Sequence, residues 1–335
     1  MNILIDMPVY ETLLKELESL PGLQIKLVDP PNEHTRELPK ELIADCDVMF
    51  CTFPPANHRD MSQLKFIQIS SSGYKQLIGQ GFDQRNVQAS NARGVFDIPI
   101  AEWSISMMVN LARDMRQIIH NQDRQIWDRP SRFQSEIRGL TVGVWGYGGI
   151  GRETARLAKS MGLKIHVLSR KGVKPRKNIY CVDGSGDEDG VLPDKIFLTS
   201  EKEKFLKSLD FLILSIPQTN DNKGIIGKHE LSMLKPSAFL LNPARGELIV
   251  EKDLIDVLQN QKIAGAALDT HYYYPLPPNH PLWKMPNVIL TPHISGSSGG
   301  PKFLERIWEI FVKNVKRLQN NEPLLNELGS KDLKN

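Results

Sequence analysis

The stretch TVGVWGYGGIGRETARLAKSMGLKIHVLSRKG, residues 141–172, decides the fold. An apolar run leads into Gly146-Tyr147-Gly148-Gly149-Ile150-Gly151, a helical pattern follows to Ser160, and a second apolar run ends at Ser169-Arg170-Lys171. Proteins with this order of strand, glycine turn, helix and strand bind the pyrophosphate of a dinucleotide at the N-terminus of the helix. Gly146 permits the turn, Gly148 lets the backbone approach the phosphates, and Gly151 lets helix and strand pack closely. The stretch therefore predicts a dinucleotide site that includes Gly149 and Ile150.

Composition limits the classes to which the chain can belong. Its 335 residues suffice for two domains, and 40% hydrophobic with 24% charged residues is ordinary for a globular protein. A net charge of +3 gives no strong field, so we expect neither a nucleic-acid nor a membrane-surface partner. Cys46, Cys51 and Cys181 have neither metal-ligand spacing nor the density of a disulfide framework. We expect a cytoplasmic protein without a metal.

Alternating strand-like and helical runs predict an α/β fold with two doubly wound domains and parallel sheets. The first set of apolar runs lies at 3–5, 24–28, 47–51 and 65–70, and the alternation resumes between 140 and 293. The loops that bind ligands in such sheets lie at the carboxyl ends of the strands. The loop Ser71-Ser72-Gly73 is therefore a candidate substrate contact, although loops of this composition are also ordinary turns.

Two further segments carry predictions of their own. Pro99 suits the first turn of a helix, and apolar residues on more than one face of 100–121 require either a domain interior or a second subunit against that helix. Residues 184–190, GSGDEDG, lack the ligand spacing of a calcium site. They predict a mobile, solvated surface loop.

Polar residues follow three strand-like runs of the second domain. Arg245 lies in NPARG after the run ending at Leu241, Asp269 follows 264–268, and His293 follows 288–290 in TPHISG. The carboxyl ends of parallel strands converge on the nucleotide crevice, so we expect these three side chains to meet there. The arginine can hold a carboxylate or carbonyl, and the histidine can take a hydroxyl proton while hydride leaves the same carbon.

Each of these residues has a purely structural alternative. The arginine can cap a loop or pair on the surface, the histidine can be a turn residue, and the aspartate can bind backbone amides. Their occurrence together after a cofactor loop favours the functional interpretation.

Four stretches in this order, VGVWGYGGIG, LNPARGELI, AALDTHYYYPLP and NVILTPHISG, resemble the D-isomer-specific 2-hydroxyacid dehydrogenase family, to which phosphoglycerate dehydrogenase belongs. The resemblance covers about residues 2–322, and FDIPIAEW resembles the family's helix that crosses between domains. It implies a flavodoxin-like substrate domain built from 1–98 and 295–335. It also implies an NAD(P)-binding Rossmann domain at 99–294, including the helix 99–121, and a homodimer formed around 100–138.

The resemblance also implies roles for individual residues. Arg245 would bind the substrate, His293 would be the acid/base, and Asp269 would hold the nicotinamide carboxamide. The backbone amides of Ser72 and Gly73 would receive the substrate carboxylate. Pro217, which closes the strand-like run 210–216, is placed with the cofactor-binding residues.

The first departure from the family pattern is Tyr274, which stands where the family usually has a glutamate immediately before a proline. A carboxylate beside the catalytic histidine would fix its tautomer and raise its pKa, whereas a neutral phenol offers one hydrogen bond and no charge. We therefore expect His293 to be less basic than its counterparts. His271 precedes the matching position by three residues and is expected in a loop or core.

The second departure lies at the end of the second strand, where NAD-binding members place an acidic residue for the ribose hydroxyls. This chain has Ser169, then Arg170 and Lys171. Without the carboxylate a 2′-phosphate is not repelled, and Arg170 can pair with it through charge-assisted hydrogen bonds. The sequence therefore predicts that NADP is preferred and NAD possible, the alternative being a basic solvent loop.

The main hypothesis is an oxidoreductase that interconverts a small 2-hydroxy acid and its 2-keto acid, with a small molecule as its only non-self partner. One alternative is a dehydrogenase of a malate-like dicarboxylate in a secondary-metabolite pathway. The other is a non-catalytic dinucleotide sensor or corepressor, which Tyr274 favours because loss of the glutamate could mean lost catalysis.

Overall fold

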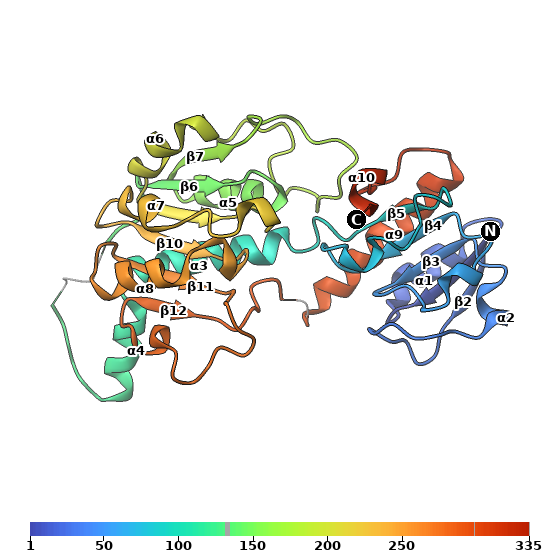
Figure 1. Cartoon of the computed structure of the whole chain (residues 1–335), viewed down its shortest axis with the longest axis horizontal. Coiled ribbons are helices and arrows are strands. Elements are labelled where there is room, and N and C mark those ends of the chain that lie inside the picture. The colour runs from blue at the N-terminus through green and yellow to red at the C-terminus, as the bar shows by residue number, and fades with distance from the viewer. Residues whose placement is uncertain (131–134, 298, 335) are drawn as a thin grey trace. The chain divides into compact units, whose positions relative to one another are not determined.

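The computed structural model describes residues 1–130, 135–297 and 299–334, and the chain divides into two compact units. Unit 1 comprises Met1–Val95, Lys177–Val182 and Gly299–Asn335, and unit 2 comprises Phe96–Arg176 and Asp183–Ser298. Both are built on a sheet of parallel strands (Figure 1). The predicted α/β class with two doubly wound domains is confirmed. The assignment of substrate to one unit and cofactor to the other stays a prediction.

Unit 1 has a five-stranded sheet in the order β2-β1-β3-β4-β5, which is the flavodoxin-like order. Phe50 of β3 stacks on Phe311 at 4.3 Å between ring centroids and meets the edge of Trp308, so the last long helix covers one sheet face. The strands are β1 Asn2–Asp6, β2 Gln24–Leu27, β3 Val48–Cys51, β4 Phe66–Ile69 and β5 Gln88–Ser90. The helices are α1 Glu11–Glu18, α2 Lys40–Ile43, α9 Pro301–Gln319 and α10 Ser330–Leu333.

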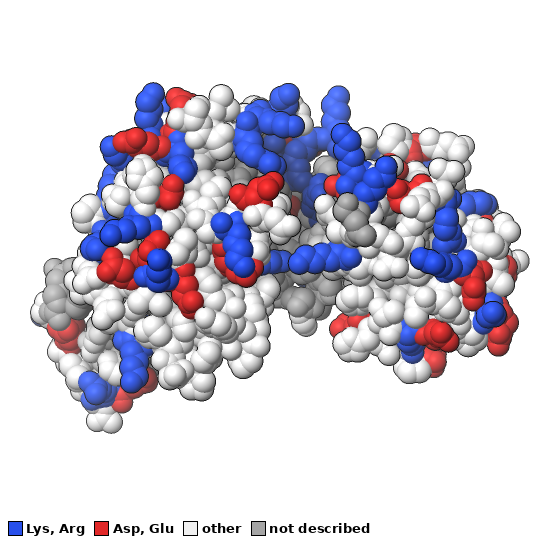
Figure 2. Space-filling model, in the orientation of Figure 1, with Lys and Arg blue, Asp and Glu red and all other residues white. Residues whose placement is uncertain are grey.

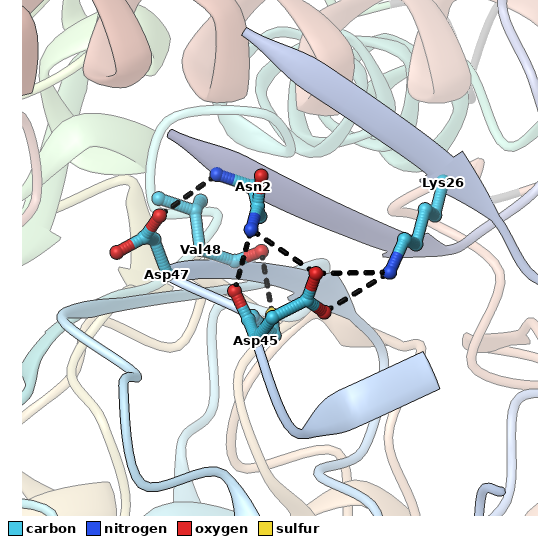
Figure 3. Close-up of polar contacts among 6 residues, drawn as sticks. Asn2, Lys26, Asp45, Asp47 and Val48 are labelled. Carbon is cyan, nitrogen blue, oxygen red and sulfur yellow. Dashed lines mark hydrogen bonds and ion pairs between the residues drawn. The ribbon is translucent and has the colours of Figure 1, made fainter. Parts of the chain in front are cut away.

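Hydrogen bonds and an ion pair link β1, β2 and the segment before β3 in unit 1 (Figure 3). The Asn2 backbone amide donates to Asp47 Oδ2 at 2.8 Å, and the Asn2 side chain donates to the carbonyl oxygen of Asp45 at 2.9 Å. Lys26 of β2 pairs with Asp45 at 3.0 Å. These contacts lie at the sheet edge opposite the carboxyl ends, which leaves the loops after β3 and β4 free of this network.

Unit 2 has a seven-stranded sheet in the order β12-β11-β10-β9-β6-β7-β8, with all pairs parallel. Chain order reverses between β6 and β9, and this switch point is where such sheets bind ligands. The strands are β6 Thr141–Trp145, β7 Lys164–Ser169, β8 Lys195–Leu198, β9 Phe211–Leu214, β10 Phe239–Asn242, β11 Gly265–Leu268 and β12 Val288–Leu290. The helices are α3 Asp97–Ala112, α4 Met115–Asp123, α5 Gly149–Ser160, α6 Lys202–Lys207, α7 Lys228–Ser232 and α8 Glu251–Gln259.

Both faces of the unit 2 sheet are buried, because successive residues of a strand point to opposite faces. Phe211 and Ile213 of β9 pack in a core with α3 and α5, whereas Leu212 and Leu214 pack in a second core with α6, α7 and α8. This double burial explains the continuous apolar runs in the sequence. Of the described helices, none is both long and apolar enough to cross a membrane.

The prediction of one helix over 100–121 is wrong. α3 ends at Ala112, Asp114 has a left-handed φ of 46°, and α4 begins at Met115. Aspartate tolerates this conformation better than most residues. The Arg116 guanidinium binds the carbonyls of Trp283, Met285 and Val288, so contacts far away in sequence fix the direction of α4.

The prediction of a free, solvated loop at 184–190 is also wrong for its central residue. Asp187 is only 7% exposed, and its carboxylate accepts a hydrogen bond from the Tyr147 hydroxyl at 2.6 Å. Shortly before it, residues 177–182 belong to unit 1, where Tyr180 is buried and donates to Glu309 at 2.5 Å. The chain thus leaves unit 2 after Arg176 and returns at Asp183.

Candidate active site

The glycine loop joins β6 to α5 at the switch point of the unit 2 sheet. Gly146 has φ +99°, and a Cβ there would meet Ile216 and the Ser215 carbonyl, so no other residue fits without strain. A Cβ on Gly151 would meet the carbonyl of Gly146, which allows the helix to start directly against the strand. Gly148 is the N-cap of α5 and, as far as the described residues show, a Cβ there would face open space. The loop thus has the form of a phosphate cradle at a helix N-terminus.

The middle of the loop is packed more tightly. A Cβ on Gly149 would collide with the carboxyl group of Asp97 at the start of α3. Ile150 lies next to it in the first turn of α5. Ser215 donates from its hydroxyl to the Gly146 carbonyl at 2.5 Å, which ties the end of β9 to the glycine turn. Pro217 is exposed two residues later, and its carbonyl accepts from Asn222 at 2.7 Å.

β7 ends at Ser169, the position at which NAD-binding proteins of this fold have an acidic residue that binds the ribose hydroxyls. Ser169 donates to the Gly172 carbonyl at 2.8 Å and so closes the turn after the strand. Arg170 and Lys171 follow and are exposed, and within the described residues neither has an ion-pair partner. Figure 2 shows Lys and Arg side chains gathered over the segment that follows β7. This end of the strand is therefore positively charged.

Asn242 holds Arg245 at the end of β10. The Asn242 side chain is buried; its oxygen accepts from the backbone amides of Ala244 and Arg245, and its nitrogen donates to the Arg245 carbonyl at 2.8 Å. Arg245 itself is exposed, and its guanidinium donates to the Ala244 carbonyl at 2.6 Å. A Cβ on Gly246 would strike the backbone of His271, so the loops after β10 and β11 touch. Sequence reasoning missed Asn242, although an Asn-Pro pair is a known turn signal.

Asp269 fixes the turn that carries His293. Its carboxylate is fully buried and accepts four hydrogen bonds from the segment after β12. The donors are the Thr291 hydroxyl at 2.5 Å, the Ile294 amide at 2.9 Å, the Ser295 amide at 3.0 Å and the Ser295 hydroxyl at 2.5 Å. The Asp269 carbonyl accepts from the His293 amide at 2.7 Å. Because four donors occupy this carboxylate, its cofactor role stays a prediction while its role in placing His293 is visible.

His293 lies in an environment that disfavours its charged form. It has φ +58° and is exposed at the end of β12. Partial burial of the ring lowers its pKa from 6.5, the charge of Arg245 lowers it further, and Asp269 offsets part of this. The loops that carry the three residues follow neighbouring strands and touch in turn, because Gly246 packs on the His271 backbone and Asp269 binds the turn that contains His293. That Arg245, Asp269 and His293 form one site stays a prediction.

Tyr274 faces His293 without sharing a hydrogen bond with it in the described chain. The ring centroids are 5.6 Å apart, and Tyr274 is 60% exposed. The Tyr274 hydroxyl accepts instead from the His271 amide at 3.2 Å. His271 is buried and bonds through Nε2 to the Thr291 carbonyl at 2.8 Å, which fixes the proton on that nitrogen. Neither residue supplies the negative charge of a carboxylate.

The loop after β4 in unit 1 carries Ser72 and Gly73. Asn91 donates to the Ser72 carbonyl at 2.8 Å, and the Ser71 hydroxyl donates to the Gly73 carbonyl at 2.7 Å. Among the described residues, no group accepts a hydrogen bond from the backbone amides of Ser72 and Gly73. The loop is thus fixed through its carbonyls while two amides remain available. The described part of the chain contains no group of three or more His, Cys, Asp and Glu that could hold a metal ion.

Sequence reasoning missed a second group of residues, which surrounds the glycine loop. Arg152 and Glu153 near the start of α5 are 4% and 1% exposed, and both bind the segment between β7 and β8. Charged residues are rarely buried without partners, but the sequence pattern gives no sign of which partners these have.

The chain is similar to known proteins of one family. Residues 105–295 match the model of the D-isomer specific 2-hydroxyacid dehydrogenase, NAD binding domain. The chain is 30% identical over 302 residues to a D-3-phosphoglycerate dehydrogenase of Methanocaldococcus jannaschii, covering 89% of this chain and 54% of that protein, about half its length. It is 27% identical to a glyoxylate reductase of Thermofilum pendens, covering 82% and 78%. A D-isomer specific 2-hydroxyacid dehydrogenase family protein from Aeromonas salmonicida superposes with a TM-score of 0.76 at 26% identity, covering 98% of both chains.

Proposed function

Because the chain belongs to the D-isomer-specific 2-hydroxyacid dehydrogenase family and is an NAD(P)-dependent 2-hydroxyacid dehydrogenase, we propose that it prefers NADP and acts on a small 2-hydroxy acid through Arg245 and His293. The observation that supports the residue roles is that the loops after β10, β11 and β12 touch: a Cβ on Gly246 would meet the His271 backbone, and the Asp269 carbonyl accepts from the His293 amide. Arg245 and His293 thus lie on loops at the carboxyl ends of neighbouring strands in the sheet that also carries the glycine loop.

Each residue takes one part of the reaction. Bound nicotinamide accepts hydride when the hydroxy acid is oxidised and supplies it when the keto acid is reduced. The planar Arg245 fork holds the substrate carboxylate or carbonyl, and Asn242 keeps that arginine at the strand end. Neutral His293 takes the hydroxyl proton during oxidation, and protonated His293 returns it to the carbonyl oxygen during reduction.

The amides of Ser72 and Gly73 complete the proposed substrate contacts in unit 1. They have no acceptor among the described residues, and neutral backbone N–H groups suit a carboxylate. The proposal also includes a homodimer formed around residues 100–138, of which 131–134 lie outside the described residues.

The preference for NADP rests on the end of β7. Ser169 turns its hydroxyl to the Gly172 carbonyl, and exposed Arg170 and Lys171 follow it. A ribose diol would find no carboxylate there, whereas a 2′-phosphate would find a guanidinium with which to form charge-assisted hydrogen bonds. NAD remains a possible, poorer cofactor.

The test is a panel of 2-keto acids, including monocarboxylates and oxaloacetate, assayed with NADPH and NADH. We expect turnover of at least one acid and a kcat/KM higher with NADPH. Arg170→Ala should reduce the NADPH value about 10-fold or more while sparing NADH, since an Arg–phosphate pair is lost. Lys164→Ala, at the opposite end of the same strand, is the matched control.

Two outcomes would contradict the proposal. Comparable kcat/KM for both cofactors, unchanged in Arg170→Ala, would overturn the NADP preference. Cofactor binding without turnover of any acid would overturn the catalytic roles and support a dinucleotide sensor.

A further inference from the structure

The segment between β7 and β8 is anchored on the glycine loop and the first turn of α5. Arg152 is buried, and its guanidinium donates to the carbonyls of Lys174 at 2.6 Å, Glu188 at 3.3 Å and Asp187. One side chain thus holds residues that precede and follow the excursion of the chain into unit 1. The Arg176 amide donates to the Glu188 carbonyl at 3.0 Å, which joins the two arms directly.

Asp187 provides the second anchor. Its Oδ2 accepts from the Tyr147 hydroxyl at 2.6 Å and from the Leu192 amide at 3.1 Å, and its Oδ1 accepts from the Val191 amide at 3.0 Å. Tyr147 is the second residue of the glycine loop, and the Arg152 guanidinium carbon lies 4.9 Å from its ring centroid. A buried carboxylate therefore joins the glycine loop to residues 187–192, and the Arg176–Glu188 backbone bond connects these residues to the arm that carries Arg170 and Lys171.

This arrangement restricts the basic residues that follow β7. Ser169 closes the turn to Gly172, and Arg152 holds the backbone of Lys174. Arg170 and Lys171 lie between these two fixed points, and their side chains are exposed. Holding a binding loop in one conformation before the ligand arrives removes part of the ordering cost of binding.

We propose that Asp187, acting through Tyr147, is a positioning residue for the 2′-phosphate of the dinucleotide. It holds the segment after β7 in place, so that Arg170 and Lys171 meet the phosphate without first being ordered. The proposal rests on the NADP preference proposed above and adds the residue that makes the basic segment effective. Asp187 touches neither the reacting atoms nor the phosphate, so its removal should affect only ligands that carry the 2′-phosphate.

The experiment measures binding of adenosine 2′,5′-bisphosphate and of 5′-AMP to the full-length protein by calorimetry. These probes differ only in the 2′-phosphate. The variants are Asp187→Asn and Tyr147→Phe, each of which removes or weakens the link while keeping a side chain of similar size. Asp189→Asn is the matched control, because Asp189 lies in the same loop and loses the same charge but is exposed.

We expect both Asp187→Asn and Tyr147→Phe to weaken binding of the bisphosphate roughly 5- to 10-fold, as lost preorganisation of one loop would. Binding of 5′-AMP should stay close to that of the Asp189→Asn control. The melting temperature of both variants should fall by a few degrees, because a buried hydrogen bond is lost, so binding is measured where all variants are fully folded. KM for NADPH should rise with kcat unchanged, since the contact is remote from the reacting carbon.

Three outcomes would overturn the inference. Equal weakening of both probes would assign Asp187 a general role in shaping the glycine loop. Weakening of 5′-AMP alone would mean that the carboxylate binds the ribose hydroxyls. No change in either variant, while Arg170→Ala still weakens the bisphosphate, would reject the positioning role and leave the NADP proposal standing. If Arg170→Ala has no effect either, the NADP preference itself fails.

Discussion

Tyr274→Glu should move the pH dependence of hydroxy-acid oxidation to higher pH. Oxidation requires neutral His293, so kcat/KM falls as pH drops through the pKa of that residue. In the native protein this pKa is lowered by partial burial and by Arg245, so the acid limb lies below the usual pH for histidine. A carboxylate at position 274 would stabilise the imidazolium and raise the pKa, which shifts the limb upward.

The size of the shift follows from the separation of the two side chains. The ring centroids of Tyr274 and His293 are 5.6 Å apart. For unit charges at that distance, Coulomb's law gives roughly 0.7 kcal/mol at the dielectric constant of water and roughly 3 kcal/mol at an effective value of about 20. Because Tyr274 is 60% exposed, the smaller value is the better guide. We expect the limb to move by roughly 0.5 to 1 pH unit.

The assay is kcat/KM for oxidation of the best substrate between pH 4.5 and 9. Tyr274→Gln is the control, because it removes the phenol and its contact with the His271 amide without adding charge. The limb of the glutamine variant should stay near that of the native protein. Coincident limbs for the glutamate and glutamine variants would refute the electrostatic reasoning, and a limb that shifts downward would reverse its sign.

Three further substitutions test the packing around the site and the excursion into unit 1. The Asp269 carboxylate accepts four hydrogen bonds, two at each oxygen, and in Asp269→Asn an NH₂ group replaces one oxygen and faces two donors that it cannot bind. We expect the free energy of unfolding, measured by urea titration, to fall by about 2–4 kcal/mol. Asn242→Ala leaves the Arg245 turn without its side-chain bonds, so KM for the keto acid should rise several-fold, with about 1–3 kcal/mol lost in the same titration. Tyr180→Phe removes the bond to Glu309 and should cost about 1–2 kcal/mol of stability without changing cofactor KM.

Much of this site could be predicted because its signals are local in sequence. The glycine spacing is a property of one turn, and Gly146 has the positive φ that the turn requires. Arg245, Asp269 and His293 each follow a short apolar strand, and the parallel topology then brings strand ends to one edge. Position along a strand is enough to predict that the three residues follow neighbouring strand ends, but it does not reveal that Asp269 accepts four hydrogen bonds from the segment after β12.

The parts that sequence could not supply depend on partners remote along the chain. Three carbonyls more than 160 residues away bind Arg116, so nothing within 100–121 shows that the helix breaks at Asp114. Asp187 lies in a glycine-rich, acidic stretch whose composition is that of a solvated loop, yet its buried partner is Tyr147, 40 residues earlier. The composition of residues 184–190 indicates a solvated loop but does not identify their contacts with residues far away in sequence.

The buried charges that the sequence did not reveal lie together around the glycine loop. Three buried charged side chains, Arg152, Glu153 and Asp187, join the glycine loop or its helix to the segment after β7. This segment begins at the strand end where NAD-binding relatives have an acidic residue for the ribose and this chain has Ser169. Burying three charged side chains carries a desolvation cost that an ordinary surface loop would not require. Local sequence rules are expected to fail where a structure serves a ligand. This desolvation free energy has a function if the buried charges hold Arg170 and Lys171 in one position for the cofactor. Binding of the bisphosphate relative to 5′-AMP measures that effect.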